Sequence, residues 1–296
     1  MRILSWLALL VVVIVAAGLM LSRPRPLPAT ALNGLTGDAE RGALIFAAAG
    51  CGSCHRAPGM ENGPLSGGRA FPSDFGTFHA PNISSDPIQG IGSWTDLQLA
   101  NAIQRGISPD GRHYYPVFPY TAYQRASPRD IADLIAHLRT LPADANPSQP
   151  HDVGFPFNIR RGIGLWKRAF GGADWVLDGS LTEEQARGRY LVEALGHCGE
   201  CHTPRNAAGG LDRHRWLAGA PNPSGKGRIP NVTPGGLNWS EGDIAIYLES
   251  GFTPDFDSAG GEMAEVVLNT AQLSDADRDA IAAYLKAIPL HTGDGN

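Results

Sequence analysis

A five-residue pattern that occurs twice limits what this chain can fold into. In each copy two cysteines are separated by two residues and followed directly by a histidine, at 51–55 and again at 198–202. The thiols of such a motif can form thioether bonds with the two vinyl groups of a haem, while the imidazole binds the iron. Two copies therefore predict two covalently bound c-type haems, around which the chain has to fold.

The cysteine count favours this interpretation over its rivals. The chain has 4 cysteines, all of them in the two motifs, so none is left for a structural disulfide. A zinc site would need four ligands from both motifs together, and a redox-active pair does not require the histidine that follows. The two histidines are the predicted proximal iron ligands. The predicted cofactor-binding residues are Cys51, Cys54, His55, Cys198, Cys201 and His202.

Length and composition set the class of protein. A chain of 296 residues, 43% hydrophobic and 18% charged, suits a globular protein of two ordinary domains. The 37 glycines and 23 prolines are many, as expected where loops wrap around a cofactor. A net charge of −5 gives no basic footprint for nucleic acid, so no nucleic-acid partner is expected.

The N-terminal segment predicts export from the cytoplasm. Residues 3–21 form an apolar run of nineteen, long for the core of a signal peptide and just long enough to span a bilayer. The stretch 29–31 has the small-x-small form of a cleavage site, but it lies beyond the proline-rich residues 24–28. Residues 1–31 are therefore a signal peptide or a membrane anchor, and the length of the run favours the anchor.

The spacing of other residues indicates that the two motifs belong to two copies of one unit. A Pro-Asn-Ile tripeptide starting at Pro81 lies thirty residues after the first motif begins, and a Pro-Asn-Val tripeptide starting at Pro230 lies thirty-two after the second begins. From Trp94 and from Trp239, a glycine follows after twelve residues and a Pro-Asp pair after fifteen. Agreement at so many points predicts duplication of one fold.

Helical periodicity and capping signals fill both copies. Asp38, Ser127 and Thr182 each stand where a helix start is expected, Ser127 with proline directly after it and Thr182 in a capping box. We therefore predict a mainly α, loop-rich fold of two tandem domains, at 35–142 and at 181–290, preceded by an N-terminal hydrophobic helix.

The connector 143–180 differs in composition from a flexible linker. Flexible linkers are polar, whereas this one contains aromatic residues such as Phe155 and Trp166. We therefore expect it to pack against both domains. Its two basic pairs, 160–161 and 167–168, fit a solvated face.

The repeat also locates the residue on the far side of each haem. Met263 stands twenty-four residues after Trp239, in what the flanking glycines predict to be an exposed turn. A methionine thioether is a usual sixth ligand of haem iron, so we predict that Met263 binds the second iron. The same offset from Trp94 gives Phe118, which has no lone pair to donate.

The first iron therefore takes another ligand or leaves this position open. His113, five residues before Phe118 on the same loop, is the preferred candidate. His79, two residues before Pro81, is the rival. A five-coordinate or weakly ligated iron is the third alternative.

Several stretches carry a resemblance to a known family. The chain resembles the multi-haem cytochrome c subunits associated with bacterial alcohol, gluconate and related periplasmic dehydrogenases, which are built of class I cytochrome c domains. The best-known members carry three haems and have methionine where this chain has Phe118. The stretches that carry the resemblance are Phe75-Gly76-Thr77-Phe78, Pro81-Asn82-Ile83, Gly90-Ile91-Gly92-Ser93-Trp94, Tyr115-Pro116-Val117-Phe118-Pro119-Tyr120, Cys198 to Asn206 and Gly261-Glu262-Met263.

The resemblance implies an electron-transfer protein on the periplasmic side of the bacterial inner membrane, anchored there or soluble. A dehydrogenase subunit would donate the electrons, and a membrane-bound or soluble acceptor of the respiratory chain would take them. We expect a non-catalytic carrier or a subunit of an oxidoreductase complex. The alternative is a dihaem peroxidase-like enzyme that binds a small ligand at the first haem.

Overall fold

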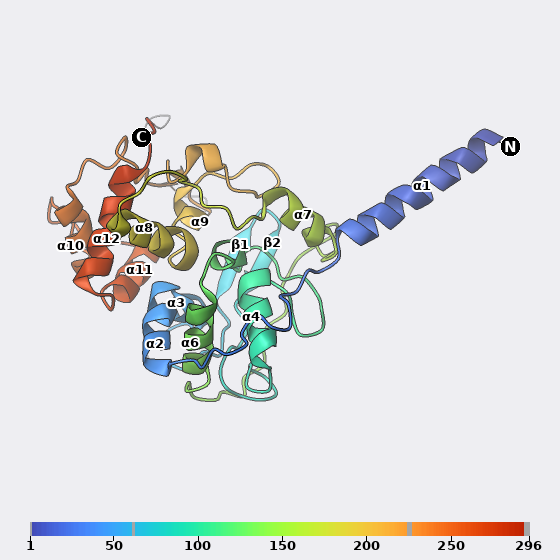
Figure 1. The fold of residues 1–296 in the computed structure, drawn as a ribbon, viewed down its shortest axis with the longest axis horizontal. Coiled ribbons are helices and arrows are strands. Elements are labelled where there is room, and N and C mark those ends of the chain that lie inside the picture. Colours follow the sequence, from blue (N-terminus) through green and yellow to red (C-terminus); the bar gives the residue numbers. More distant parts are fainter. Residues whose placement is uncertain (1, 61–62, 224–226, 293–296) are drawn as a thin grey trace.

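The computed structural model describes residues 2–60, 63–223 and 227–292, and consists of a helical body from which one long helix projects (Figure 1). The projecting helix is α1 (Arg2–Leu21), and α7 (Gly162–Phe170) lies in the connector. The first unit contains α2 (Ala39–Ala48), α3 (Cys51–His55), β1 (Ala70–Ser73), β2 (Gly76–His79), α4 (Asp96–Arg105), α5 (Tyr120–Tyr123) and α6 (Pro128–Leu138). The second contains α8 (Glu183–Arg189), the π-helix η1 (Tyr190–Leu195), α9 (Gly199–His202), the 3-10 turn η2 (Arg213–Arg215), β3 (Ala220–Pro221), β4 (Arg228–Ile229), α10 (Glu241–Ser250), α11 (Glu262–Thr270) and α12 (Asp275–Ala287).

Local sequence signals account for where the helices begin. The Asp38 carboxylate accepts hydrogen bonds from the backbone amides of Glu40 and Arg41 in α2, and Ser127 caps α6 with proline at the first helical position. Thr182 forms the expected capping box at the start of α8. These three predicted helix starts are confirmed, and the mainly α, loop-rich fold is confirmed with them.

The duplication is also visible in pairs of residues between the helices. In the first unit an isolated antiparallel bridge joins Ile107 to His113, and in the second a bridge joins Phe252 to Ser258. Both members of the second bridge lie 145 residues after their counterparts, the same interval that separates the two tryptophans at 94 and 239. The register read from the sequence therefore holds through the loop that was expected to carry the distal ligands.

In each unit the first helix crosses the last helix at a glycine. A Cβ atom added at Gly42 of α2 would lie 2.0 Å from the carbonyl oxygen of Asp133 in α6. One added at Gly188 of α8 would lie 1.8 Å from the carbonyl oxygen of Ala280 in α12. Glycine is required at both positions because the two backbones meet there directly.

Gly188→Ala is therefore expected to destabilise the protein by about 3 kcal/mol, since overpacking that moves backbone costs roughly this much. Thermal unfolding followed by circular dichroism checks it, and the midpoint should fall by several degrees. The matched control is Gly242→Ala in α10, where the nearest atom would be 3.8 Å away. The control should leave the midpoint unchanged or raise it slightly, and an equal fall in both variants would contradict the crossing argument.

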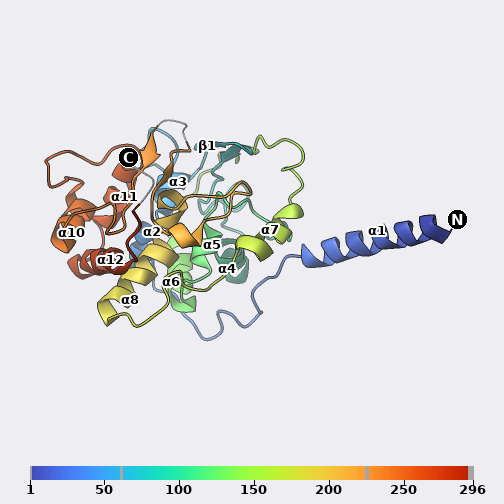
Figure 2. The same ribbon diagram turned by 90° about the horizontal axis from the view of Figure 1, so that it is seen from above.

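The two units share one hydrophobic core. Buried apolar side chains of α4 and α6 in the first unit form a continuous cluster with those of η1, α10 and α12 in the second. Both views show the second unit, in orange and red, seated against the first unit, in blue and green (Figures 1 and 2). Because the cluster is continuous, the relative placement of the two motifs is fixed by packing.

A buried carboxylate ties the units and the connector together. Glu193 of η1 is 1% exposed and accepts the backbone amides of Val176 at 2.7 Å and Leu177 at 3.2 Å. The hydroxyl of Tyr284 in α12 donates to it as well. Its positive partner is Arg125 of the first unit, whose Nε lies 4.0 Å away. One side chain thus satisfies groups from three parts of the chain.

Glu193→Gln is expected to destabilise the protein by about 3 kcal/mol, because removing one member of a buried ion pair leaves the other charge uncompensated. The shift of the urea midpoint at constant slope measures it. Glu184→Gln, at an exposed position in the first turn of α8, is the control and should stay within about 0.5 kcal/mol of the native protein. Equal effects at the two positions would show that the buried network contributes nothing specific.

The end of α1 is capped by arginines of the connector. Arg161 donates to the carbonyl oxygen of Leu19 at 2.8 Å and to the hydroxyl of Ser22 at 2.9 Å. Arg168 donates to the carbonyl oxygen of Leu21 at 2.5 Å. The last carbonyl groups of a helix have no partner within it, so these donors complete the helix end. Both arginines are exposed, as the expected solvated face requires, and in addition they hold the end of α1.

The other basic residue of α7, Lys167, packs inward. Lys167 Nζ donates to the carbonyl oxygens of Arg105 at 2.6 Å and Gly106 at 2.8 Å, and lies 4.2 Å from the ring centroid of Tyr120. Burial lowers its pKa to about 7. On the second unit, the connector contacts Ala208 through the indole nitrogen of Trp166 at 2.8 Å. The connector thus touches both units.

Candidate haem sites

Each motif folds as a short helix, α3 or α9, that holds its histidine in the same way. His55 Nδ1 donates to the carbonyl oxygen of Pro81 at 2.8 Å, and His202 Nδ1 donates to that of Pro230 at 2.8 Å. A ring held through Nδ1 keeps its proton there and leaves the Nε2 lone pair free. Burial lowers the pKa of both imidazoles. Both rings therefore suit a proximal ligand of iron.

The thiols do not suit the rival interpretations. Burial raises the pKa of Cys51 and of Cys198 to about 12, and that of Cys54 to about 11. A redox-active pair needs a lowered thiol pKa. Within residues 2–60, 63–223 and 227–292, no group of three or more His, Cys, Asp or Glu could hold a metal ion. The chemistry of the donor set fits covalent haem attachment.

The two motifs lie close together although 147 residues separate their first cysteines. Burial raises the pKa of Cys54, and the Cys201 thiol is near enough to raise it further by charge repulsion. Ser53, inside the first motif, accepts a hydrogen bond at 2.8 Å from the amide of Asn269 in α11. The attachment points of the two haems are therefore neighbours across the shared core.

Two aromatic side chains pack on each other beside the motifs, and neither was expected from the sequence. His197, directly before the second motif, has a φ of 41°, and its ring centroid lies 5.7 Å from that of Tyr123. Tyr123 donates at 2.8 Å to the carbonyl oxygen of Ala49, two residues before the first motif. A signal was present, because the first motif has Gly50 where the second has this histidine.

The predicted distal position is built differently in the two units. Met263 is partly buried and lies in the first turn of α11, so the expected exposed turn is a helix start. Phe118 occupies the corresponding place before α5, where its ring centroid lies 6.2 Å from those of Tyr114 and Tyr120 and 5.9 Å from that of Tyr123. An aromatic cluster thus replaces a sulfur donor in the first unit.

Both candidate histidines of the first unit have contacts of their own. His113 is buried, with Nε2 at 2.9 Å from the carbonyl oxygen of Ser22, and burial lowers its pKa. The backbone amide of His79 donates to His151 Nδ1 at 3.1 Å. Among the described residues, Nδ1 of His113 and Nδ1 of His79 are buried without a hydrogen-bond partner. Each ring therefore retains one nitrogen that the protein does not use.

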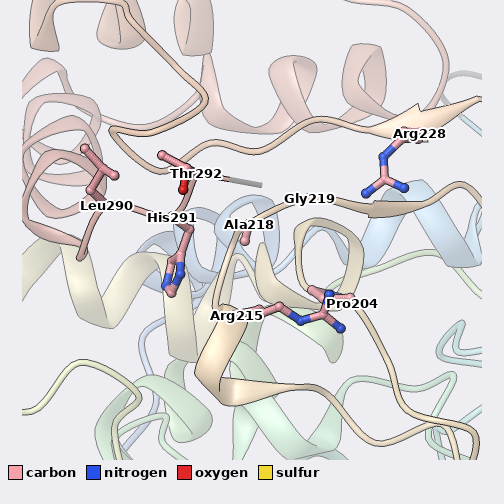
Figure 3. A pocket seen from close by; sticks show the side chains of 8 residues that line it. All are labelled: Pro204, Arg215, Ala218, Gly219, Arg228, Leu290, His291 and Thr292. Carbon is pink, nitrogen blue, oxygen red and sulfur yellow. The ribbon is translucent and has the colours of Figure 1, made fainter. Parts of the chain in front are cut away.

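A pocket of about 210 Å³ in the second unit is lined by two arginines, Arg215 and Arg228 (Figure 3). The backbone amide of Gly219, in its wall, donates to the carbonyl oxygen of His202 at 2.8 Å. Arg215 forms an ion pair with Asp212 at 2.8 Å. Arg228 lies on β4. Two arginines suit an anionic group such as a carboxylate. The lining residues are Pro204, Arg215, Ala218, Gly219, Arg228, Leu290, His291 and Thr292.

Comparisons with known proteins agree with this geometry. The cytochrome c family profile matches residues 39–142 and 185–289. A dihaem cytochrome c-type protein of Cereibacter sphaeroides is 58% identical over 283 residues, which are 95% of this chain and 96% of that protein. The cytochrome subunit of fructose dehydrogenase from Gluconobacter japonicus is 38% identical over 99% of this chain. The cytochrome c subunit of a quinone alcohol dehydrogenase from Gluconobacter oxydans is 36% identical over 84%.

The chain covers 61% of the fructose dehydrogenase subunit and 54% of the alcohol dehydrogenase subunit. Each stretch matched by the profile contains one tethering motif and its histidine. The resemblance to dehydrogenase cytochrome c subunits is confirmed, and so are two covalently bound haem c groups and an electron-transfer role. This chain belongs to the cytochrome c family, as a member with two cytochrome c domains.

Proposed function

We propose that this protein is a dihaem cytochrome anchored on the periplasmic side of the bacterial inner membrane. A dehydrogenase reduces it, and a membrane-bound or soluble acceptor of the respiratory chain oxidises it. Relatives that are cytochrome subunits of fructose, alcohol and gluconate dehydrogenases support a dehydrogenase donor. The haem domains are 35–142 and 181–290, with 143–180 as the connector.

The residues named from the sequence take these roles in the proposal. The four motif cysteines hold the haems, His55 and His202 bind the irons, and Met263 completes the second iron. For the first iron the candidates are His113, whose Nε2 bonds the Ser22 carbonyl while its Nδ1 has no partner, His79, or an open position.

The observation that carries the proposal is the closeness of the two motifs across one core. Electron tunnelling needs haems held at fixed, short separation, and the protein sets their potentials through ligands and burial. The contact of Ser53 with Asn269 and the packing of Tyr123 on His197 provide such a fixed junction. An electron that enters at one haem can therefore leave through the other.

The junction after α1 supports a retained anchor. The apolar stretch Ile3–Leu21 has the length and composition to cross a membrane, and Ser22 directly after it is 2% exposed. Further on, the backbone amide of Leu27 donates at 2.7 Å to the side chain of Asn101 in α4. Cleavage near residue 31 would remove these contacts from the folded unit, so they favour an uncleaved segment.

We therefore expect the mature protein to keep residues 1–31 and to stay in the membrane fraction. Mass spectrometry of the purified chain and a carbonate wash of isolated membranes check this, because carbonate releases peripheral proteins and leaves spanning helices in place. A soluble mature protein that begins near Leu32 would show that the segment is only a signal peptide.

The proposal that a dehydrogenase is the electron donor is tested by purifying the protein in mild detergent and by rapidly mixing the purified complex with the substrate of the dehydrogenase. A dehydrogenase should co-purify, and its substrate should reduce both haems within one turnover of the complex. The chain alone, with peroxide and a reduced donor, should show no steady-state turnover. Turnover with peroxide would instead favour the peroxidase-like alternative at the first haem.

A further inference from the structure

We propose that residues 155–169, which end in α7, form a second membrane-contacting surface that lies in the headgroup region of the bilayer. This inference rests on the proposed anchoring by α1. Large apolar side chains are exposed here in close succession, and exposed apolar patches of this kind mark sites of contact with a protein or a membrane. They are Phe155 at 80%, Phe157 at 46%, Ile159 at 53% and Leu165 at 44% exposure.

The charge of the segment matches an anionic lipid surface. Between Asp152 and Asp174 the sequence has no acidic residue, whereas the chain as a whole has a net charge of −5. Four basic residues lie in this interval, in the pairs 160–161 and 167–168. Arg161 and Arg168 are exposed and can meet lipid headgroups, whereas Lys167 packs inward. Interfacial segments combine aromatic and aliphatic side chains with Lys and Arg in this way.

The fold holds the segment beside the point where α1 leaves the body. Gly164 packs so closely that an added Cβ would lie 2.2 Å from the carbonyl oxygen of Ser22. Arg161, directly before α7, and Arg168, within it, donate to α1 carbonyl oxygens. Both views show α7 at the base of α1, with α10 at the opposite end of the body (Figures 1 and 2). If α1 crosses a membrane, α7 is therefore the part of the body that lies nearest to the bilayer.

The exposed and buried sides of α7 agree with this orientation. Ile163 and Gly164 are buried against the body, while Leu165, Arg168 and Ala169 are exposed. A protein partner could cover an apolar patch equally well in general. Continuity with the end of the anchor and the absence of acidic residues favour the bilayer over a dehydrogenase subunit at this patch.

Single cysteines test the proposal in the full-length holoprotein, reconstituted in nanodiscs that contain phosphatidylglycerol. The four native cysteines are used in thioethers, so an introduced thiol is the only free one. Ile159→Cys is compared with Ile246→Cys in α10, an isoleucine of matched exposure at 58%. Val12→Cys reports on α1 itself. The rate of modification by a membrane-impermeant maleimide is measured by mass spectrometry, and haem content confirms folding.

We expect Ile159→Cys to be modified at least about tenfold more slowly than Ile246→Cys, and Leu165→Cys to behave like Ile159→Cys. Equal rates at 159 and 246 with a protected thiol at position 12 would overturn the membrane surface and leave the anchor in place. A freely modified thiol at position 12 would overturn the anchor, and the surface with it. Protection at 159 that appears only after a dehydrogenase is added would assign the patch to that partner and overturn the proposal.

Discussion

Met263→His is expected to lower the midpoint potential of one haem by on the order of 0.1–0.3 V and to leave the other unchanged. Axial ligands span roughly 0.8 V in haem proteins, and a thioether raises the potential relative to an imidazole. Met263 stands in the first turn of α11 at the position that the repeat assigns to the distal ligand. A spectroelectrochemical titration resolves the two haems, and the sulfur-to-iron absorption band of the ferric protein should disappear.

The control for this prediction is Met60→His. Met60 is 51% exposed and has no proposed ligand role, so the variant makes the same change of side chain away from the distal position. Both potentials and the absorption band should match those of the native protein. If Met263→Ala kept the band, another group would be the sulfur donor and the register argument would be wrong.

The sequence predicted the fold well because the two repeats could be compared with each other. Each marker in the first unit has a partner in the second, so a wrong register would have failed at several points. The bridges at His113 and Ser258 follow the interval set by Trp94 and Trp239. Helix starts such as Thr182 depend on side chains within one turn, and local signals of this kind can be read without tertiary information.

What the sequence did not predict are contacts between segments far apart in the chain. Glu193 reaches Arg125 across 68 residues, and nothing near either residue marks it as a partner. The sequence did not indicate the hydrogen bonds of Arg161 and Arg168, because their acceptors are backbone carbonyls of α1 more than a hundred residues away. Such pairs depend on how the units dock, which periodicity within one unit does not encode.

The asymmetry between the haems gives the proposed direction of electron flow. If His202 and Met263 bind the second iron as proposed, we expect the second haem to have the higher potential. The first haem has a phenylalanine at the corresponding place, so we expect its potential to be lower whether a histidine or no strong ligand completes it. Electrons then enter through the first unit, cross the junction between the motifs and leave through the second. Two equal potentials in the native protein would contradict this order.

Phe118→Met should raise the potential of the first haem, by roughly 0.1–0.3 V, and create a second sulfur-to-iron band. The site can accept the change because methionine is flexible and Phe118 is only partly buried. Redox titration and the intensity of the band measure the result.

Phe118→Leu is the matched control, since it removes the ring without adding a donor and should create no band. His79→Ala and His113→Ala, each combined with Phe118→Met, decide between the alternatives for the native sixth ligand. If one histidine binds the iron, its removal alone should change the spectrum of the first haem, and in the double variant the new band should become stronger. If neither removal alters the spectrum, the position is open in the native protein, and methionine at 118 fills it without competition. A Phe118→Met protein that folds, holds two haems and shows no second band would place residue 118 away from the first iron.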